Sequence, residues 1–425
     1  MNEIFEKFSQ RQIYCLPFGN RLIIYGQWQQ LDQEERSWLQ QEKEQLLTSY
    51  SDSSCILSLP CWLNAMVLSE IISGDCSQFG LFYLAPDSVP PEPSKLKNLI
   101  EGLYRTFPLL NSAVEWGDSG LELRLFTSPY NAEPEYQESV QYADAQAFIR
   151  EQLQYPHSVF KRGMLRVVYA RCSKDMRWGI WLHHLIADVD FVQTLLSRVH
   201  VWLKTAAWPE PDLDFIQQIW VLEQQIIVHR ERLQTFWCNQ KALFSTLVMP
   251  PTWELLPDSS LMSFTLHDEP QMFTRMILSL SRTLAKLNIN GPQLAITPVT
   301  LRRIGRRNTG SGCYVNLLPI LLDARYEVTE FDQLRLSWLE HAQLPQEEIT
   351  SLCELNYRDA IVMINFIDTP IVMEGFQHHP EFRSRKPITI TVTHGEPGFW
   401  HVKLTTRWGE TFSNALHSIL VEELT

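Results

Sequence analysis

The sequence predicts an α/β protein with two lobes, and three observations support this fold class. The chain has 425 residues, of which 45% are hydrophobic and only 20% charged, so it can bury two cores of ordinary domain size. Short apolar runs that are typical of buried strands alternate with longer runs of helical spacing. Pro209-Glu210-Pro211 interrupts this pattern near the middle of the chain, which indicates a lobe boundary there.

Residues 1–55 differ in composition from the rest of the chain and are expected to form an N-terminal extension packed on the core. Arg21–Tyr25 is apolar enough for a short strand. Asp32–Ser49 is polar, with leucines spaced for one apolar face, and is predicted to be a surface helix. Asp32 followed by Glu35 indicates a capping box at its start.

The N-terminal lobe is expected to span residues 56–208. Its first elements are predicted, in order, as a loop at Ile56–Pro60, a helix at Trp62–Ile72, a strand at Phe79–Leu84, a helix at Lys95–Phe107, strands at Ser112–Trp116 and Leu121–Phe126, and a helix at Ala143–Leu153. Met164–Arg171 alternates as strands do and is predicted to pair with Arg177–His183, with Lys174-Asp175 at the turn. A helix that ends near Lys204 follows.

The C-terminal lobe is expected to span residues 209–425. Its elements are predicted, in order, as a long helix at Leu213–Phe244, a strand starting at Ser263–Leu266, a helix at Gln271–Leu287, strands at Gln293–Thr300 and Ala360–Phe366, a hairpin of Ile388–Thr393 with Trp400–Arg407, and a last helix at Phe412–Glu423. The sequence has no internal repeat and no low-complexity tract.

Composition excludes several classes of function. A net charge of −13 argues against a nucleic-acid partner. The sequence lacks a secretory signal and any run of the ~20 apolar residues that a membrane helix needs, so no membrane partner is expected. The eight cysteines are scattered without a Cys-x-x-Cys pair, which predicts reduced thiols in a cytoplasmic protein and no metal site.

The candidate site lies where an apolar strand ends and a helix begins, at His183-His184-Leu185-Ile186-Ala187-Asp188. Side chains at such a junction face a crevice in α/β folds. An imidazole titrates near neutral pH and can take a proton from an attacking amine or hydroxyl. Asp188 or Asp190 could cap the helix. The alternative is that a histidine here is a hydrogen-bonded core residue. A second pair, His378-His379, has no matching aspartate and is interpreted as a surface loop.

The His-His-x-x-x-Asp string after an apolar strand resembles the active-site motif of the condensation domains of nonribosomal peptide synthetases, which belong to the chloramphenicol acetyltransferase-like superfamily. The resemblance begins near residue 56 and runs to the C-terminus. Phe236-Trp237 resembles an aromatic pair of the family, and Gly312-Cys313-Tyr314-Val315-Asn316-Leu317-Leu318-Pro319 resembles its Gly-x-x-Val-Asn-Thr-Leu-Pro stretch. Two positions depart from the pattern: Val189 replaces a glycine, and Leu321 replaces a frequent arginine.

The resemblance implies a fold of two chloramphenicol acetyltransferase-like lobes in a V-shaped arrangement, with an active-site tunnel between them. It implies that His184 contacts the nucleophile and that His183 and Asp188 support it. The aspartate would pair with an arginine of the second lobe, for which Arg302 has a compatible spacing and Arg303 is the fallback. Asn316 would support the site. The alternative for Arg302 is an exposed loop charge.

The function implied is that of a free-standing condensation enzyme, which forms an amide between an acyl or aminoacyl thioester and an amine in nonribosomal peptide or siderophore-like biosynthesis. The partners would be an acyl or peptidyl carrier protein acting in trans, which supplies a phosphopantetheine arm, and an amine, free or carrier-bound. No cofactor would be bound to this chain. Arg306 and Arg307 are a candidate dock for an acidic carrier.

Two alternatives stay open: an acyl-CoA-dependent transferase of the same fold, which makes esters or amides, and a catalytically silent module that recruits carrier proteins. Val189 would either narrow the tunnel for a small substrate or impair the site. The sequence lacks the aspartates of heterocyclising relatives, the Glu-Gly-His-Gly-Arg stretch of epimerising ones and the Asp-Phe-Gly-Trp-Gly of plant-type acyl-CoA transferases.

Overall fold

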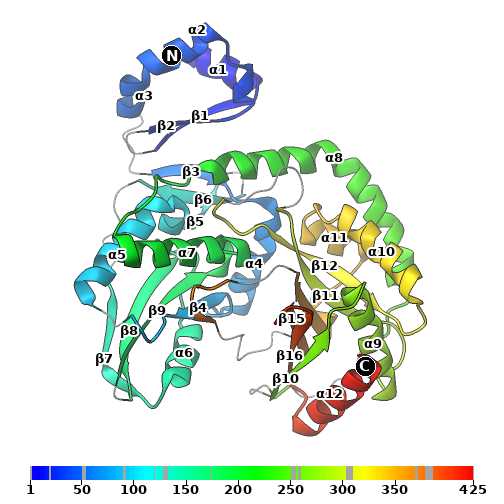
Figure 1. The fold of residues 1–425 in the computed structure, drawn as a ribbon. Helices are drawn as coiled ribbons and strands as arrows, with labels where there is room; N and C mark the ends of the chain where they lie inside the picture. Colours follow the sequence, from blue (N-terminus) through cyan, green and yellow to red (C-terminus); the bar gives the residue numbers. More distant parts are fainter. Residues whose placement is uncertain are drawn as a thin grey trace. The chain divides into compact units, whose positions relative to one another are not determined.

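The protein is described by a computed structural model (Figure 1), which covers residues 2–18, 21–49, 54–89, 92–118, 120–127, 133–173, 175–249, 255–256, 260–302, 310–368, 372–378 and 386–424. The chain forms two compact units. The first comprises Met1–Gln225, Arg302–Cys313 and Met373–His379; the second comprises Ile226–Leu301, Tyr314–Val372 and Pro380–Thr425. The predicted boundary between residues 208 and 209 is therefore wrong, because the division falls inside helix α8 (Asp214–Phe244) and two later segments join the first unit.

The N-terminal extension has a small core of its own. Its elements are α1 (Asn2–Gln10), β1 (Ile13–Phe18), β2 (Arg21–Gly26), α2 (Gln33–Gln41) and α3 (Lys43–Ser49). They bury Phe8, Ile13, Leu31, Leu39 and Leu46 together. The single surface helix predicted over Asp32–Ser49 is two helices. The capping box is confirmed, because the Asp32 side chain accepts a hydrogen bond from the Glu35 backbone N–H at 2.8 Å and the Glu35 side chain accepts one from the Asp32 N–H at 3.0 Å.

A glycine turn attaches this extension to the rest of the first unit. The Gly26 N–H donates to Oε1 of Gln217 on α8 at 2.7 Å, and Nε2 of Gln217 donates back to the Gly26 carbonyl at 3.3 Å. Gly26 has a φ of +88°, and a Cβ at this position would lie 2.1 Å from the carbonyl oxygen of Gln12. Only glycine fits this close approach without strain.

The main sheet of the first unit has the strand order β14-β4-β9-β8-β7. Its strands are β4 (Gly80–Leu84), β7 (Glu135–Tyr142), β8 (Leu165–Cys172), β9 (Asp175–His183) and β14 (Gln377–His378). The hairpin of β8 and β9 is confirmed, and its turn residue Lys174 lies outside the described residues. The surface loop predicted at His378 is wrong, since His378 pairs with Tyr83 on β4; His379 is also outside the described residues.

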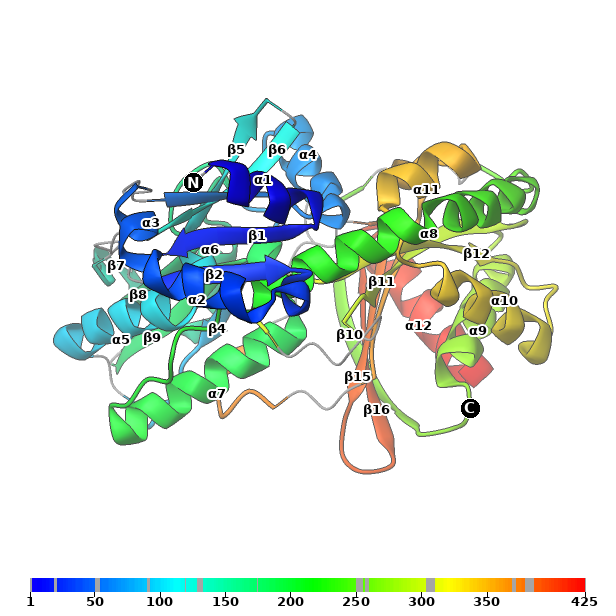
Figure 2. The same ribbon diagram turned by 90° about the horizontal axis from the view of Figure 1, so that it is seen from above.

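Helices and a second small sheet complete the first unit. Helix α6 (Ala145–Leu153) packs on one face of the main sheet through Phe148, whose ring meets that of Phe82 edge to face. Figures 1 and 2 show α7 (Val189–Thr205) running beside α5 (Pro93–Thr106). The remaining elements are α4 (Asn64–Ser73) and the three-stranded sheet of β3 (Ser54–Ser58), β6 (Gly120–Phe126) and β5 (Ser112–Gly117). The loop predicted from Ile56 is therefore mostly strand β3, because it pairs along β6.

The second unit is a mixed six-stranded sheet in the order β10-β16-β15-β13-β11-β12. Its strands are β10 (Ser260–His267), β11 (Gln293–Thr300), β12 (Val315–Leu322), β13 (Val362–Ile367), β15 (Ile388–His394) and β16 (Phe399–Thr406). Strand β13 pairs in parallel with β11 and β15, and the other pairings are antiparallel. Helices α9 (Met272–Lys286) and α12 (Glu410–Leu424) lie side by side in both ribbon views. Helices α10 (Val328–Glu340) and α11 (Gln346–Cys353) were not predicted.

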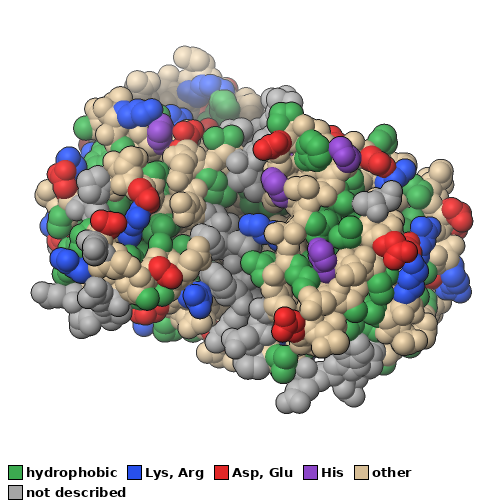
Figure 3. Space-filling view, turned by 60° about the horizontal axis from the view of Figure 1, so that its bottom comes forward, with side chains coloured by type: hydrophobic (Ala, Val, Ile, Leu, Met, Phe, Trp, Pro, Cys, Tyr) green, Lys and Arg blue, Asp and Glu red, His purple; other side chains and the backbone are tan. Residues whose placement is uncertain are grey.

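The surface mixes charges of both signs. On the face drawn in Figure 3, Asp and Glu side chains are interspersed with Lys and Arg, and no continuous basic field is seen over the described residues. Within the described ranges, no helix has both the length and the apolar character needed to span a bilayer.

Candidate active site

The candidate site is built where β9 ends. Strand β9 is paired on both edges, with β4 and β8, so its last residues are held in the core. One 3-10 turn, η4 (His184–Ile186), follows, and α7 begins at Val189. Oδ1 of Asp188 accepts a hydrogen bond from the Phe191 N–H at 3.0 Å and so caps α7. Such a cap typically stabilises a helix by about 1 kcal/mol. It also fixes the side chain of Asp188, which lies four residues after His184 in the sequence.

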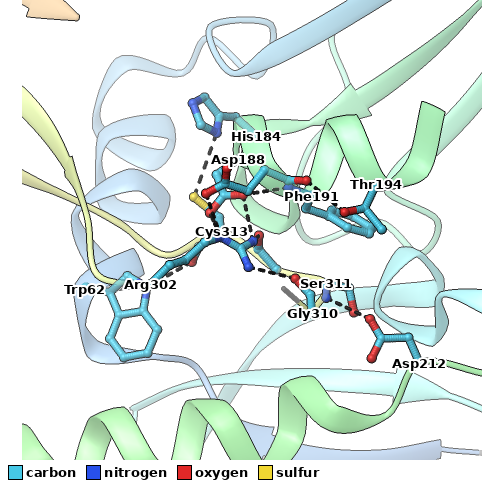
Figure 4. A network of polar contacts seen from close by, with 12 residues as sticks. Trp62, His184, Asp188, Phe191, Thr194, Asp212, Arg302, Gly310, Ser311 and Cys313 are labelled. Atoms are coloured by element: carbon cyan, nitrogen blue, oxygen red, sulfur yellow. Dashed lines mark hydrogen bonds and ion pairs between the residues drawn. The ribbon is translucent and has the colours of Figure 1, made fainter. Parts of the chain in front are cut away.

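Asp188 forms a buried, two-pronged ion pair with Arg302 (Figure 4). Nε of Arg302 lies 2.8 Å from Oδ2 of Asp188 and Nη2 lies 2.7 Å from Oδ1; each side chain is only 4% exposed. This geometry is the strong form of an arginine–carboxylate contact. The pairing with Arg302 is therefore present, and the alternative of an exposed loop charge at Arg302 is wrong. Arg303, the fallback partner, lies outside the described residues.

Arg302 also holds the segment that follows it. Its Nη1 and Nη2 donate to the carbonyls of Gly310 and Gly312, each at 2.8 Å. Gly312 forms a parallel bridge with Ala187, directly before Asp188. The guanidinium therefore joins the His-His-x-x-x-Asp turn to residues 310–312, so both belong to the first unit. Arg306 and Arg307, the candidate dock, lie outside the described residues.

His183 is fully buried and contacts a second carboxylate. Its Nδ1 accepts a hydrogen bond from the Leu185 N–H at 3.1 Å, and its Nε2 lies 3.3 Å from Oε2 of Glu70 on α4. Burial works to raise the pKa of Glu70, but the nearby His183 ring and a hydrogen bond from the Val159 N–H outweigh it and lower that pKa below its usual value. The alternative of a hydrogen-bonded core histidine therefore describes His183.

His184 is half-buried, and its ring contacts a thiol. Its Nδ1 lies 3.9 Å from Sγ of Cys313, while the other ring nitrogen points away from this network in Figure 4. The backbone of Cys313 is fixed as well, because its carbonyl accepts a hydrogen bond from Nε1 of Trp62 at 2.9 Å. His184 therefore has one nitrogen directed at a protein partner and one directed elsewhere.

Known structures share this fold. The chain is 15% identical to the starter condensation domain of rhizomide synthetase, with a TM-score of 0.67 over 87% of this chain and 95% of that one. It is 14% identical to the first condensation domain of the calcium-dependent antibiotic synthetase, with a TM-score of 0.66 over 88% and 96%. An epimerization domain of tyrocidine synthetase B matches at 12% identity, with a TM-score of 0.64 over 87% and 96%. No family model matches the sequence, and no curated protein does.

The fold is that of a condensation domain. Identities of 12–15% establish the fold and do not assign a reaction, and the neighbours include both condensation and epimerization domains. The tunnel expected between the lobes stays a prediction.

Two other predicted site residues have defined places in this condensation-domain fold. Val189 is the first residue of α7 and is half-buried, directly beside the Asp188 cap. Asn316 is buried on β12 in the second unit, where its Nδ2 donates to the carbonyls of Ala342 and Leu344 at 2.8 and 2.7 Å. The amide hydrogens of Asn316 therefore fix the turn between α10 and α11.

The structure adds three residues that the sequence did not single out as site residues: Glu70, Cys313 and Asp212. Oδ2 of Asp212 accepts a hydrogen bond from the Ser311 N–H at 2.8 Å and so anchors the same segment as Arg302. For Glu70, the sequence shows only a carboxylate within a mostly apolar helical run. It stands three residues after Val67, and both side chains are buried in the structure. Among the described residues, no group of three or more His, Cys, Asp or Glu side chains could hold a metal ion.

Proposed function

We propose that this protein forms an amide bond between a carrier-bound acyl or aminoacyl thioester and an amine, with His184 as the residue that contacts the attacking nitrogen. One observation carries the proposal. His184 projects half-exposed from a turn that is fixed on both sides, by the buried His183 before it and by the Asp188–Arg302 pair after it. A reactive side chain held on a rigid turn is what a positioned general base requires.

The contact with Cys313 supports a different proposed role for each ring nitrogen of His184. If Nδ1 carries the proton and donates it toward Sγ of Cys313, Nε2 carries the lone pair of the neutral ring. That lone pair accepts a proton from the amine as its nitrogen bonds to the thioester carbonyl carbon. The carbon–sulfur bond then breaks, and the departing thiolate takes that proton from the His184 imidazolium and leaves as a thiol. A base in this position contributes about 10²–10⁴-fold to the rate.

The proposed partners follow from this chemistry. The acyl group is proposed to arrive on the phosphopantetheine arm of a carrier protein supplied in trans, and the acceptor is a free or carrier-bound amine. None of the eight cysteines, all of them within the described residues, forms a disulfide, which supports the proposal of a reducing compartment such as the cytoplasm. The half-buried β-branched Val189 beside the site supports a compact substrate, since it stands where a glycine would leave more space.

A carrier protein loaded with a labelled acyl group, incubated with candidate amines, tests the proposal. Amide product should form with the wild type and fall by about 10²-fold or more in His184→Ala, because the base is lost. His229→Ala is the matched control, since His229 is exposed on α8 and far along the sequence from the turn. Its turnover should equal that of the wild type.

Each alternative gives a different result in the same assay. Product formation from acyl-CoA without a carrier would indicate the acyl-CoA-dependent transferase. Binding of the loaded carrier without product would indicate a recruitment module. Unchanged turnover in a folded His184→Ala variant would contradict the assignment of His184.

A further inference from the structure

The ring of His183 is contacted at both nitrogens, which fixes where its proton sits. Nδ1 accepts the hydrogen bond from the Leu185 N–H at 3.1 Å, so Nδ1 carries no proton. The proton of the neutral ring is therefore on Nε2, which lies 3.3 Å from Oε2 of Glu70. A charged ring would place a second proton on Nδ1, facing the N–H of Leu185, and would lose that bond.

Glu70 is suited to hold the Nε2–H form. It is 3% exposed, and its Oε1 is occupied by the Val159 N–H at 3.1 Å, which directs Oε2 toward the ring. The Val159 N–H donates to the carboxylate and so favours its ionised form, in which Oε2 is an acceptor toward the ring. The other groups that face it are uncharged: Ser158, the Cys76 thiol and His157, whose pKa burial lowers to about 4.

We propose that Glu70 is a positioning residue for the candidate site. Its carboxylate places a negative charge 3.3 Å from Nε2, which favours the tautomer of His183 that carries its proton there; in that tautomer Nδ1 accepts from Leu185. Leu185 lies inside the η4 turn, so this hydrogen bond fixes the turn from which His184 projects. A carboxylate on α4 thus sets the direction of a side chain that it does not touch. The consequence for turnover rests on the proposed function; the tautomer of His183 does not.

Replacing Glu70 by glutamine separates this role from simple filling of space. The amide keeps the shape and has one acceptor oxygen and one donor nitrogen. If the oxygen keeps the Val159 N–H, the amide nitrogen faces Nε2 of His183, and the ring must shift its proton to Nδ1. That proton then opposes the N–H of Leu185. If the amide turns round, its nitrogen opposes the Val159 N–H instead.

The test is the protonation state of the His183 ring nitrogens in the full-length protein, measured by long-range ¹H–¹⁵N correlation of histidine-labelled samples. The wild type should show a protonated Nε2 and an unprotonated Nδ1 at pH 7. In Glu70→Gln the protonated nitrogen should become Nδ1, or exchange of the Leu185 amide hydrogen should speed up at least about tenfold because its hydrogen bond is lost. The kcat for amide formation should fall by about 10- to 100-fold, with less change in KM.

Glu347→Gln is the matched control, because Glu347 is a half-buried carboxyl in the second unit whose oxygens contact no hydrogen-bond partner. It should leave the His183 nitrogens and the Leu185 amide as in the wild type. A protonated Nδ1 in the wild type would overturn the proposal, and this result needs no variant to fold. An unchanged tautomer together with unchanged exchange of both the Leu185 and the Val159 amide hydrogens in folded Glu70→Gln would also overturn it. If the nitrogens respond as expected but neither protein makes amide, the proposed function fails and the positioning role stands.

Discussion

At the scale of single residues, Arg302 makes the hydrogen bonds that hold the candidate site together. It gives two hydrogen bonds to Asp188 and two to the carbonyls of Gly310 and Gly312, all between 2.7 and 2.8 Å. A lysine has one charged nitrogen and could not reproduce this fork. Removing one member of a buried pair leaves the other charge uncompensated, which costs about 3–5 kcal/mol.

Arg302→Leu should therefore lower the free energy of unfolding by about 3–5 kcal/mol, measured by urea denaturation. Asp188→Asn added to it should restore a good part of that loss, because asparagine caps a helix as well as aspartate does and carries no charge to leave unpaired. The control is Arg230→Leu, which breaks a largely exposed pair with Glu348 and should cost below about 1 kcal/mol. If the changes in the free energy of unfolding caused by Arg302→Leu and Asp188→Asn simply added up in the double variant, the energetic coupling between these two side chains would be contradicted.

Local sequence predicted the residues that sit on one turn and missed those that approach it from elsewhere. His183, His184 and Asp188 lie within six positions, and the strand–helix pattern placed them together. Arg302 was found through the family resemblance. Cys313 is 129 positions from His184, and nothing in its own neighbourhood indicates that contact. The contact between Glu70 and His183 could not be predicted either, because it depends on how α4 packs against the rest of the first unit.

At the scale of elements, helix α8 contains a carboxyl whose ionisation opposes folding. Glu223 is half-buried in the first unit, and burial raises its pKa to about 7, although the Cys61 N–H partly offsets this by hydrogen bonding. In the unfolded chain the same group would titrate near its ordinary value of 4.5. Between these values the folded protein keeps a proton that the unfolded chain has lost, so raising the pH through this range favours unfolding.

Glu223→Gln should gain melting temperature relative to the wild type as the pH rises from 5 to 8. His157, whose pKa burial lowers to about 4, makes the opposite contribution to the pH slope in both proteins, so the difference between the two proteins isolates Glu223. At pH 8 the variant should be more stable than the wild type by about 1–3 kcal/mol, because the cost of ionising a buried carboxyl is removed while the acceptor oxygen for Cys61 is kept. Thermal unfolding of both proteins between pH 5 and 8 measures this difference in stability. A variant with the same pH slope as the wild type would exclude Glu223 as the cause.

Elements with a strong internal period were predicted, and elements made by tertiary pairing were not. The strands β8, β9, β15 and β16 and the helices α7 and α9 follow their hydrophobic spacing closely. Strand β7 is mostly polar, EYQESVQY, and is a strand because it pairs with β8 at the edge of the sheet. Strand β3 alternates over only a few residues before Pro60 and was therefore interpreted as a loop.

At the scale of the whole molecule, the first unit is assembled from three separate stretches of chain. Residues 302–313 and 373–379 return to it from beyond the second unit's first segment. Pro209-Glu210-Pro211 does mark a break, but it lies in the connection between α7 and α8, within one unit. A change in composition identifies a loop, whereas contacts such as Asp212 with Ser311 decide which unit a segment belongs to.

A fragment of residues 1–225 should therefore not form a stable cooperative unit, although its length is that of an ordinary domain. It lacks Arg302, which leaves the buried carboxylate of Asp188 without its partner, and it lacks β14, which leaves an edge of β4 uncovered. Circular dichroism and urea denaturation should show a broad transition or none. A fragment as stable as the first unit of the full chain would contradict this, and Asp188→Asn should make the fragment measurably less unstable.

Strand β14 also has a consequence for the order of events on the ribosome. Its partner β4 is finished at residue 84, but β14 is not made until residue 378. At roughly 5–20 residues per second, the interval from residue 225 to residue 378 lasts roughly 8–30 seconds. Throughout that time Tyr83 and Leu84, at the end of β4, lack the two residues that pair with them in the finished protein. Exposed strand edges are prone to pair with other chains, and this end of the sheet is completed only late in synthesis.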